Sequence, residues 1–111
     1  MGITYYNSNP VPVEYTEVEM REIVLGYIYS SKTEFSFRNL SYYIVQKAIE
    51  EQKVKNASNT QYSSNEMDSI SSIQLSKILW ELIWDKKIYI AFGENPFVTR
   101  YKGDVRFVPV I

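Results

Sequence analysis

Two chemically versatile residue types, cysteine and histidine, do not occur in this sequence of 111 residues. Without cysteine the chain forms no disulfide and offers no thiolate nucleophile, a composition that fits a reducing compartment. Without histidine it has no imidazole base and no histidine pH switch. These absences exclude Ser-His-Asp and Cys-His catalysis, and zinc sites built on imidazole or thiolate ligands.

Glycine is scarce as well, with four residues at positions 2, 26, 93 and 103. That distribution contains no glycine-rich loop for binding phosphates. The adjacent carboxylates of Glu50 and Glu51 diverge by about 100° on a helix and do not form a catalytic pair. We therefore expect no catalytic residue, no metal site, no cofactor and no small-molecule substrate, and we predict that the protein is not an enzyme.

Long apolar runs are missing too, since none approaches the roughly 20 residues that span a bilayer. The first fifteen residues lack the basic and apolar regions of a secretory signal. A chain of this length, 45% hydrophobic, is large enough for one domain with a modest core. We expect a soluble, cytoplasmic, single-domain protein with no membrane partner.

The N-terminal segment is predicted to lead into a helix. Prolines at positions 10 and 12 favour an extended arm over residues 1–15. Thr16 and Glu19 have the spacing of a capping box, in which each side chain bonds to the backbone N–H of the other. The first helix is therefore expected over about residues 17 to 30.

A second helix is expected after a short extended piece, with Ser36 or Asn39 as its cap and an end near Lys53. The segment of about 54–68 that follows has almost no large apolar side chains, so it is predicted to be a mobile loop. Beyond it, several polar residues compete to cap a third helix that begins between positions 64 and 72. They are Ser63 with Glu66, Asp68, Ser69 and Ser71.

The stretch LSKILWELIWDKKIYIAFG, residues 75 to 93, changes its hydrophobic period from helical to alternating. Apolar residues recur every three or four positions as far as Ile83 and then alternate from Ile88, so a helix is predicted to run almost directly into a strand. The segments FVTRY and VRFVPVI, separated by turn signals, are predicted to be further strands. Pro109 lacks an N–H group, so the last strand is expected to be an edge at that end.

The predicted order is helix, short strand, helix, loop, helix and strands, and in this order the chain resembles the winged-helix family of helix-turn-helix domains. The resemblance covers roughly residues 16–111 and rests chiefly on ILWELIWDKKIYIAF, where a core-facing helix leads into a first wing strand. It implies an α+β fold, winged-helix-like, of three helices with a C-terminal β-hairpin or three-stranded antiparallel meander. An unrelated α+β domain of helices and a hairpin is the alternative.

In winged-helix proteins the third helix typically lies in the DNA major groove and the wing lies on the adjacent backbone or minor groove. The resemblance therefore implies a DNA-binding regulator or replication accessory that binds double-stranded DNA. Its predicted DNA-binding residues are Gln74, Ser76 and Lys77 on the helix and Lys87, Arg100, Lys102 and Arg106 on the wing.

The exposed side of the third helix is less suited to base recognition than the family suggests. At about 100° per residue, Ile73, Trp80 and Trp84 lie opposite the core-facing Leu75, together with a single lysine at position 77. The tryptophans could pack under the N-terminal arm, anchor a homodimer or protein partner, or stack on nucleic-acid bases. The alternative function is thus a protein–protein interaction module that uses Ile73, Trp80 and Trp84 and does not bind DNA.

Charge is divided unevenly along the chain. Residues 1–34 carry five glutamates against two cations, a balance of −3, whereas residues 86–106 carry five cations against two carboxylates, a balance of +3. The formal net charge is −1, and proteins that grip duplex DNA normally show a clear basic stripe. Composition alone favours protein interaction, and the family resemblance favours DNA binding.

Overall fold

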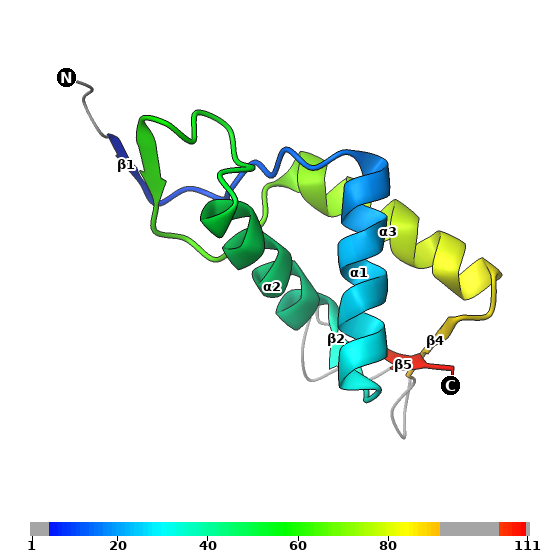
Figure 1. Ribbon diagram of the computed structural model, residues 1–111. Coiled ribbons are helices and arrows are strands. Elements are labelled where there is room, and N and C mark those ends of the chain that lie inside the picture. Colours follow the sequence, from blue (N-terminus) through cyan, green and yellow to red (C-terminus); the bar gives the residue numbers. More distant parts are fainter. Residues whose placement is uncertain (1–4, 92–104, 111) are drawn as a thin grey trace.

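A computed structural model describes residues 5–91 and 105–110, which form three helices and five short strands. Figure 1 shows the helices as one cluster, with β1 and β3 near the end of α2 and the strands β2, β4 and β5 on the other side of the molecule. In chain order the elements are β1 (Tyr5–Asn7), α1 (Glu17–Ser31), β2 (Phe35–Ser36), α2 (Phe37–Glu50), β3 (Thr60–Tyr62), α3 (Ser69–Trp84), β4 (Ile88–Ile90) and β5 (Arg106–Pro109).

Helix α1 begins where the sequence predicts. The Thr16 hydroxyl accepts a hydrogen bond from the Glu19 N–H at 3.1 Å, and the Thr16 N–H donates to Glu19 Oε1 at 2.9 Å, so the predicted capping box is confirmed. The helix ends at Lys32, whose backbone is left-handed with φ 54° and whose N–H bonds to the Ile28 carbonyl. Its buried residues are Met20, Val24 and Ile28.

The caps of α2 and α3 are each one of the predicted alternatives. The Ser36 hydroxyl accepts from the Asn39 N–H at 3.0 Å, and Asp68 Oδ1 accepts from the Ser71 N–H at 3.0 Å. Asp68 therefore caps α3, and the hydroxyl of Ser71, another of the candidates, is bonded to Val13 of the N-terminal arm instead.

The sheet is antiparallel and has the strand order β2-β5-β4. Phe107 in the central strand pairs with Phe35 on one side and with Ile90 on the other. The expected class, α+β with three helices and a small antiparallel sheet, is thus present in the described residues. The sheet is not a meander of consecutive strands, because its third member is β2, which lies between α1 and α2 in the chain.

Pro109 lies at the end of β5 that extends beyond β2. Strand β2 reaches only Arg106 and Phe107, so within the described residues Pro109 has a strand neighbour on one side alone, opposite Ile88. Its missing N–H leaves no gap in the sheet, as expected for an edge. The predicted strand 97–101 and the turns at 93–96 and 102–104 lie outside the described residues.

The N-terminal arm and the segment expected to be a loop pair with each other. β1 runs parallel to β3, and bridges join Val11 to Met67 and Val13 to Val54. The structure thus differs from the expected loop at 60–62, where it has the strand β3, and the bridged side chains Val54 and Met67 are buried against Val11 and Val13 of the arm. This pairing was invisible to periodicity, since it joins segments about 50 residues apart.

The core collects apolar side chains from all three helices, from the arm and from the sheet. Its residues include Val11, Tyr15, Met20, Val24, Ile28, Phe35, Leu40, Ile44, Val45, Leu75, Ile78, Leu79, Leu82, Ile88 and Phe107. Within the described residues no buried side-chain polar atom lacks a hydrogen-bond partner.

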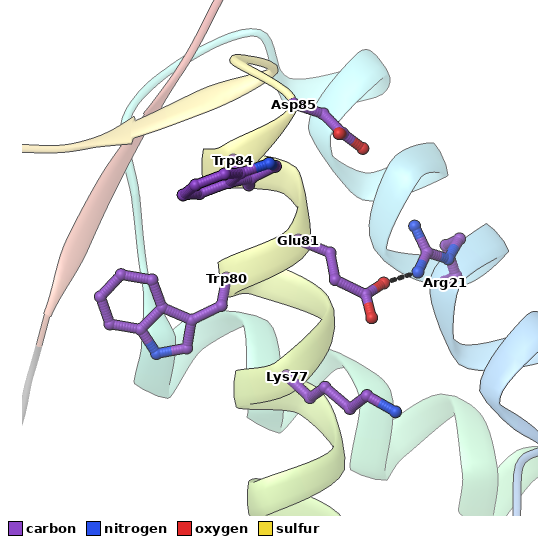
Figure 2. A pocket seen from close by; sticks show the side chains of 6 residues that line it. All are labelled: Arg21, Lys77, Trp80, Glu81, Trp84 and Asp85. Atoms are coloured by element: carbon purple, nitrogen blue, oxygen red, sulfur yellow. Dashed lines mark ion pairs between the residues drawn. The ribbon is translucent and has the colours of Figure 1, made fainter.

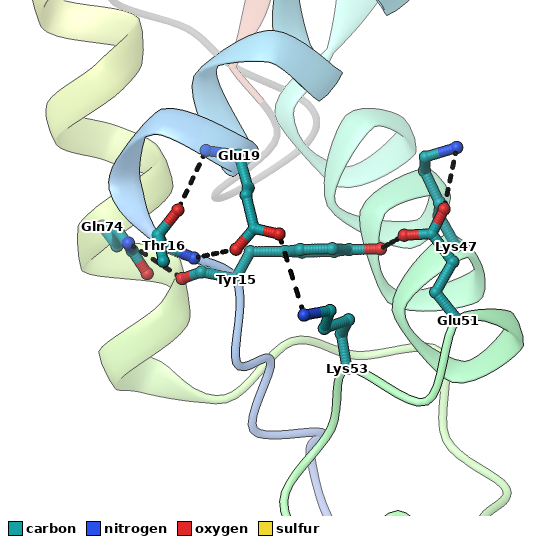
Figure 3. A network of polar contacts seen from close by, with 7 residues as sticks. All are labelled: Tyr15, Thr16, Glu19, Lys47, Glu51, Lys53 and Gln74. Carbon is teal, nitrogen blue, oxygen red and sulfur yellow. Dashed lines mark hydrogen bonds and ion pairs between the residues drawn. The ribbon is translucent and has the colours of Figure 1, made fainter.

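A polar network holds the end of the arm against α1 and α2 (Figure 3). The Tyr15 hydroxyl donates to Glu51 Oε1 at 2.5 Å, and Glu51 also lies 3.5 Å from Lys47, while Lys53 lies 3.8 Å from Glu19. Burial and the neighbouring carboxylate raise the pKa of Tyr15. The hydrogen bond from Tyr15 in turn lowers the pKa of Glu51.

Candidate functional site

Helix α3 carries a continuous row of exposed side chains on the side away from the core. Trp84 is 86% exposed and Trp80 is 64% exposed, although both are large and apolar. We call this row the α3 seam, and its members are Ile70, Ile73, Lys77, Trp80 and Trp84.

The spacing within the α3 seam is three, four, three and four residues. At 3.6 residues per turn these five positions fall within about 80° of one another, so they form a single stripe. The opposite side of the helix is buried and consists of Ser71, Leu75, Ile78, Leu79 and Leu82. The helix therefore has two apolar faces, of which the fold covers one.

The described part of the N-terminal arm does not cover the tryptophans. Val11 and Val13 are buried, but they pair with Met67 and Val54 at the other end of the structure's core. The arm was one of three explanations for the apolar face, and for residues 5–15 it is wrong. Among residues 5–91 and 105–110, no other segment takes the place of the arm, so an interface or a stacking surface is the explanation we pursue.

The flank of α3 toward α1 is polar. Arg21 forms an ion pair with Glu81, and the Lys77 ammonium lies 3.7 Å from Glu17 Oε1. Figure 2 shows Glu81 and Lys77 extending toward α1 while both indoles extend to the other side of the helix. A shallow depression extends from this flank across to the indoles, and it is lined by Arg21, Lys77, Trp80, Glu81, Trp84 and Asp85. The depression contains two cationic and two anionic side chains, so its charge does not favour the binding of either an anion or a cation.

The flank of α3 toward the sheet is apolar and forms a small groove of about 190 Å³. Trp80 lines this groove as well as the α3 seam, so the two surfaces are continuous. The other main lining residues are Phe37, Leu79, Ile83, Ile90 and Phe107.

The polar residues predicted to read bases are engaged with the protein's own backbone. The Gln74 amide donates to the Tyr15 carbonyl at 3.4 Å, and the Ser76 hydroxyl donates to the Ser72 carbonyl at 2.8 Å. Lys77 is more than half exposed, but its ammonium faces the Glu17 carboxylate. All three lie on α3 as predicted, and their donors are directed at acceptors within the fold.

The predicted wing cations are only partly described. Arg106 lies on β5 and its Nε is 2.8 Å from Glu34 Oε1, so a carboxylate offsets its charge. Lys87 is exposed where the chain enters β4. Arg100 and Lys102 lie outside the described residues.

Sequence reasoning missed Ile70 and the groove residue Ile83 as parts of the exposed surface. Ile70 stands three positions before Ile73, so extending the spacing by one step toward the N-terminus would have found it. Ile83 was assigned to the core-facing stripe, and the structure leaves it half-buried at the edge of that stripe. Nothing in the sequence marked Arg21 and Glu81, because their ion pair depends on how α1 and α3 pack.

In the part of the chain that the structure describes, no group of three or more acidic side chains is placed to hold a metal ion. Nor does any helix there have the length and apolar character needed to cross a membrane. Comparison of the chain with known protein families, characterised proteins and solved structures gave no match of any kind.

Proposed function

We propose that this chain is a winged-helix-type domain that binds another protein through the α3 seam. The carrying observation is that Ile70, Ile73, Trp80 and Trp84 expose most of their surfaces on one side of one helix. Soluble domains rarely leave contiguous apolar surface uncovered unless it binds something. Tryptophan is also the residue type most enriched among the side chains that dominate binding energy at protein interfaces.

The winged-helix assignment is supported by the order of elements. Apart from β1 and β3, which pair with each other in a separate sheet, the chain runs α1, β2, α2, α3, β4, β5, and β2 joins the two C-terminal strands in one antiparallel sheet. Two departures count against a DNA-reading member of that family. The connection from α2 to α3 is longer than the tight turn of a helix-turn-helix, and the outward face of α3 is apolar.

Electrostatics also favours protein over duplex. Phosphate contacts supply most of the affinity of proteins for DNA, and Lys77 and Arg106 are each offset by a glutamate. The helix offers two indoles where base recognition calls for arginine, lysine, asparagine or glutamine. An apolar, weakly charged face suits a partner that buries it away from water.

The test is photo-crosslinking in cells with a benzophenone amino acid at position 73, in the middle of the α3 seam. We expect adducts that resist nuclease and are removed by protease, because the reactive group would lie within a protein interface. The matched control carries the same group at position 29 on α1, where Tyr29 is 60% exposed and off the seam. Adducts that are nuclease-sensitive, or equal adducts from both positions, would refute the proposal.

Duplex DNA binding is the second candidate, favoured by the excess of three positive charges in residues 86–106. It predicts that a random duplex binds at low ionic strength and is released steeply as salt rises. The variant Arg100→Glu with Lys102→Glu should abolish this binding. If the unmodified chain leaves fluorescence anisotropy of the duplex unchanged at low salt, this candidate is rejected.

A further inference from the structure

We infer that the partner of the α3 seam is a second copy of this chain, with the two α3 helices packed antiparallel about a two-fold axis. The inference rests on the proposed function, because it names the partner of the same surface. It goes further in fixing which residue meets which.

The α3 seam has the repeat of a coiled-coil interface. In heptad notation the a positions are Ile70, Lys77 and Trp84, and the d positions are Ile73 and Trp80. In an antiparallel pair an a position faces a d position. One register places Lys77 against Trp80 of the partner subunit and Trp84 against Ile73 of the partner subunit. Because a two-fold interface is self-complementary, each contact occurs twice.

The central contact explains why a lysine interrupts an otherwise apolar row. In the single chain its ammonium faces Glu17 at 3.7 Å; on association it would leave this carboxylate, with its methylene stem along the seam. In the antiparallel register this cation reaches the face of an indole, which is the aromatic ring that attracts cations most strongly. A parallel register would place Lys77 against Lys77 of the partner subunit, where like charges repel.

Charges at the two ends of α3 favour the same direction. Glu66 and Asp68 stand at the start of the helix, and Glu66 is exposed. At its end stand Asp85, Lys86 and Lys87, all exposed, with a net charge of +1. Antiparallel packing brings the lysine pair of one copy beside the acidic start of the other. Parallel packing would bring lysine pair beside lysine pair.

The exposed area is also about what a dimer requires. A stable interface buries about 800 Å² on each partner, and one large aromatic side chain supplies about 150–250 Å². Two tryptophans that are 64% and 86% exposed, with two isoleucines that are 69% and 76% exposed, supply most of that area. The groove beside Trp80 extends the apolar surface toward the sheet.

The first experiment measures the mass of the full chain by sedimentation equilibrium over a concentration series. We expect a reversible dimer, and we expect Trp84→Ala to raise its Kd about tenfold or more, since the loss is repeated on both copies. Tyr29→Ala removes an exposed aromatic ring of α1 that is off the seam and should leave the Kd unchanged. Circular dichroism confirms that both variants are folded.

The second experiment tests the register and uses the fact that the chain has no native cysteine. Position 73 should face position 84 of the partner, whereas two copies of position 73 lie about 16 Å apart along the helices, beyond disulfide reach. We therefore expect that a mixture of Ile73→Cys and Trp84→Cys chains forms a mixed disulfide on mild oxidation. Either chain alone should stay uncrosslinked.

Each result decides a different claim. A chain that stays monomeric at all concentrations overturns the inference, and the proposed function survives if position 73 still yields protein adducts in cells. A dimer that is insensitive to Trp84→Ala, or that crosslinks Ile73→Cys to itself, overturns the antiparallel seam. Absence of protein adducts from position 73 together with a monomeric chain overturns both.

Discussion

The two faces of α3 are both largely apolar, but one is buried in the core and the other is exposed to solvent. Leu75, Ile78 and Leu82 are almost completely removed from water, whereas Ile73 and Trp84 on the other side are largely exposed. Hydrophobicity of the helix therefore does not decide which side is buried. What decides it is the structure that packs against each side. One face packs against α1, the strand β4 and the end of the N-terminal arm, and within the described residues nothing packs against the other.

This contrast separates stability from binding. Side chains that are already buried contribute to the free energy of unfolding of the single chain. Exposed apolar side chains contribute little until a partner covers them. Substitutions on the two faces should accordingly give different results in the same two measurements, unfolding and association.

The largest effect should come from the buried face. We expect Leu82→Ala to lower the free energy of unfolding by about 2–5 kcal/mol. The leucine side chain is 1% exposed, so its removal leaves a cavity in the core. Urea denaturation monitored by circular dichroism measures the change. The volume-conserving control Leu82→Met should lose less than about 1.5 kcal/mol. Equal losses for the two variants would show that packing at this position is not tight.

A smaller loss should follow from a polar change on the same buried face. The Ser71 hydroxyl accepts from the Val13 N–H at 3.0 Å and lies 3.4 Å from the Val13 carbonyl, and Ser71 is 3% exposed. Ser71→Ala leaves these backbone groups without their partner and should cost about 1–3 kcal/mol in urea denaturation. Ser69→Ala, at an exposed position in the first turn of α3, serves as the control and should change stability by less than about 0.5 kcal/mol.

The sequence predicted features that depend on residues close together in the chain, and it did not predict those that depend on contacts between distant segments. The capping box at Thr16 and the run of α3 into β4 were predicted correctly, because both are decided by residues a few positions apart. The pairing of the arm with residues 54–67 and the position of β5 between β2 and β4 were not predicted. These depend on contacts between distant segments, which leave no periodic trace.

The same distinction applies to the candidate site. Periodicity identified Ile73, Trp80 and Trp84 as opposite the core, and their exposure could not be predicted because it depended on where the N-terminal arm packs. The glutamates that face Lys77 and Arg106 were likewise hidden, since both pairs join elements far apart in the chain. Sequence alone therefore did not reveal that these two cations are paired with carboxylates.

Acid should weaken the polar network of Tyr15, Glu51 and Lys47, which holds the end of the N-terminal arm against α2. The pKa of Glu51 is below its usual value of 4.5, so the stability it contributes is fully present above about pH 4.5 and is lost as pH falls through the lowered folded-state pKa. We expect the urea midpoint to fall on acidification below pH 4.5, and to fall less in Glu51→Gln, which no longer titrates. Tyr15→Phe removes the hydrogen bond that lowers this pKa and should also flatten the profile. Identical profiles for all three chains would exclude Glu51 as a source of the acid sensitivity.

The smallest effect should come from the exposed face, and it is the sharpest test of the contrast. At a concentration low enough to keep the chain monomeric, the double variant Trp80→Ser with Trp84→Ser should unfold within about 0.5 kcal/mol of the unmodified chain, because both indoles are already in water. Leu79→Ser, on the same helix but 2% exposed, is the matched control and should be strongly destabilised. As concentration rises, the unmodified chain should gain stability by mass action while the double variant does not. A large loss in the dilute double variant would mean that the tryptophans support the fold itself, and the two faces would then have the same role.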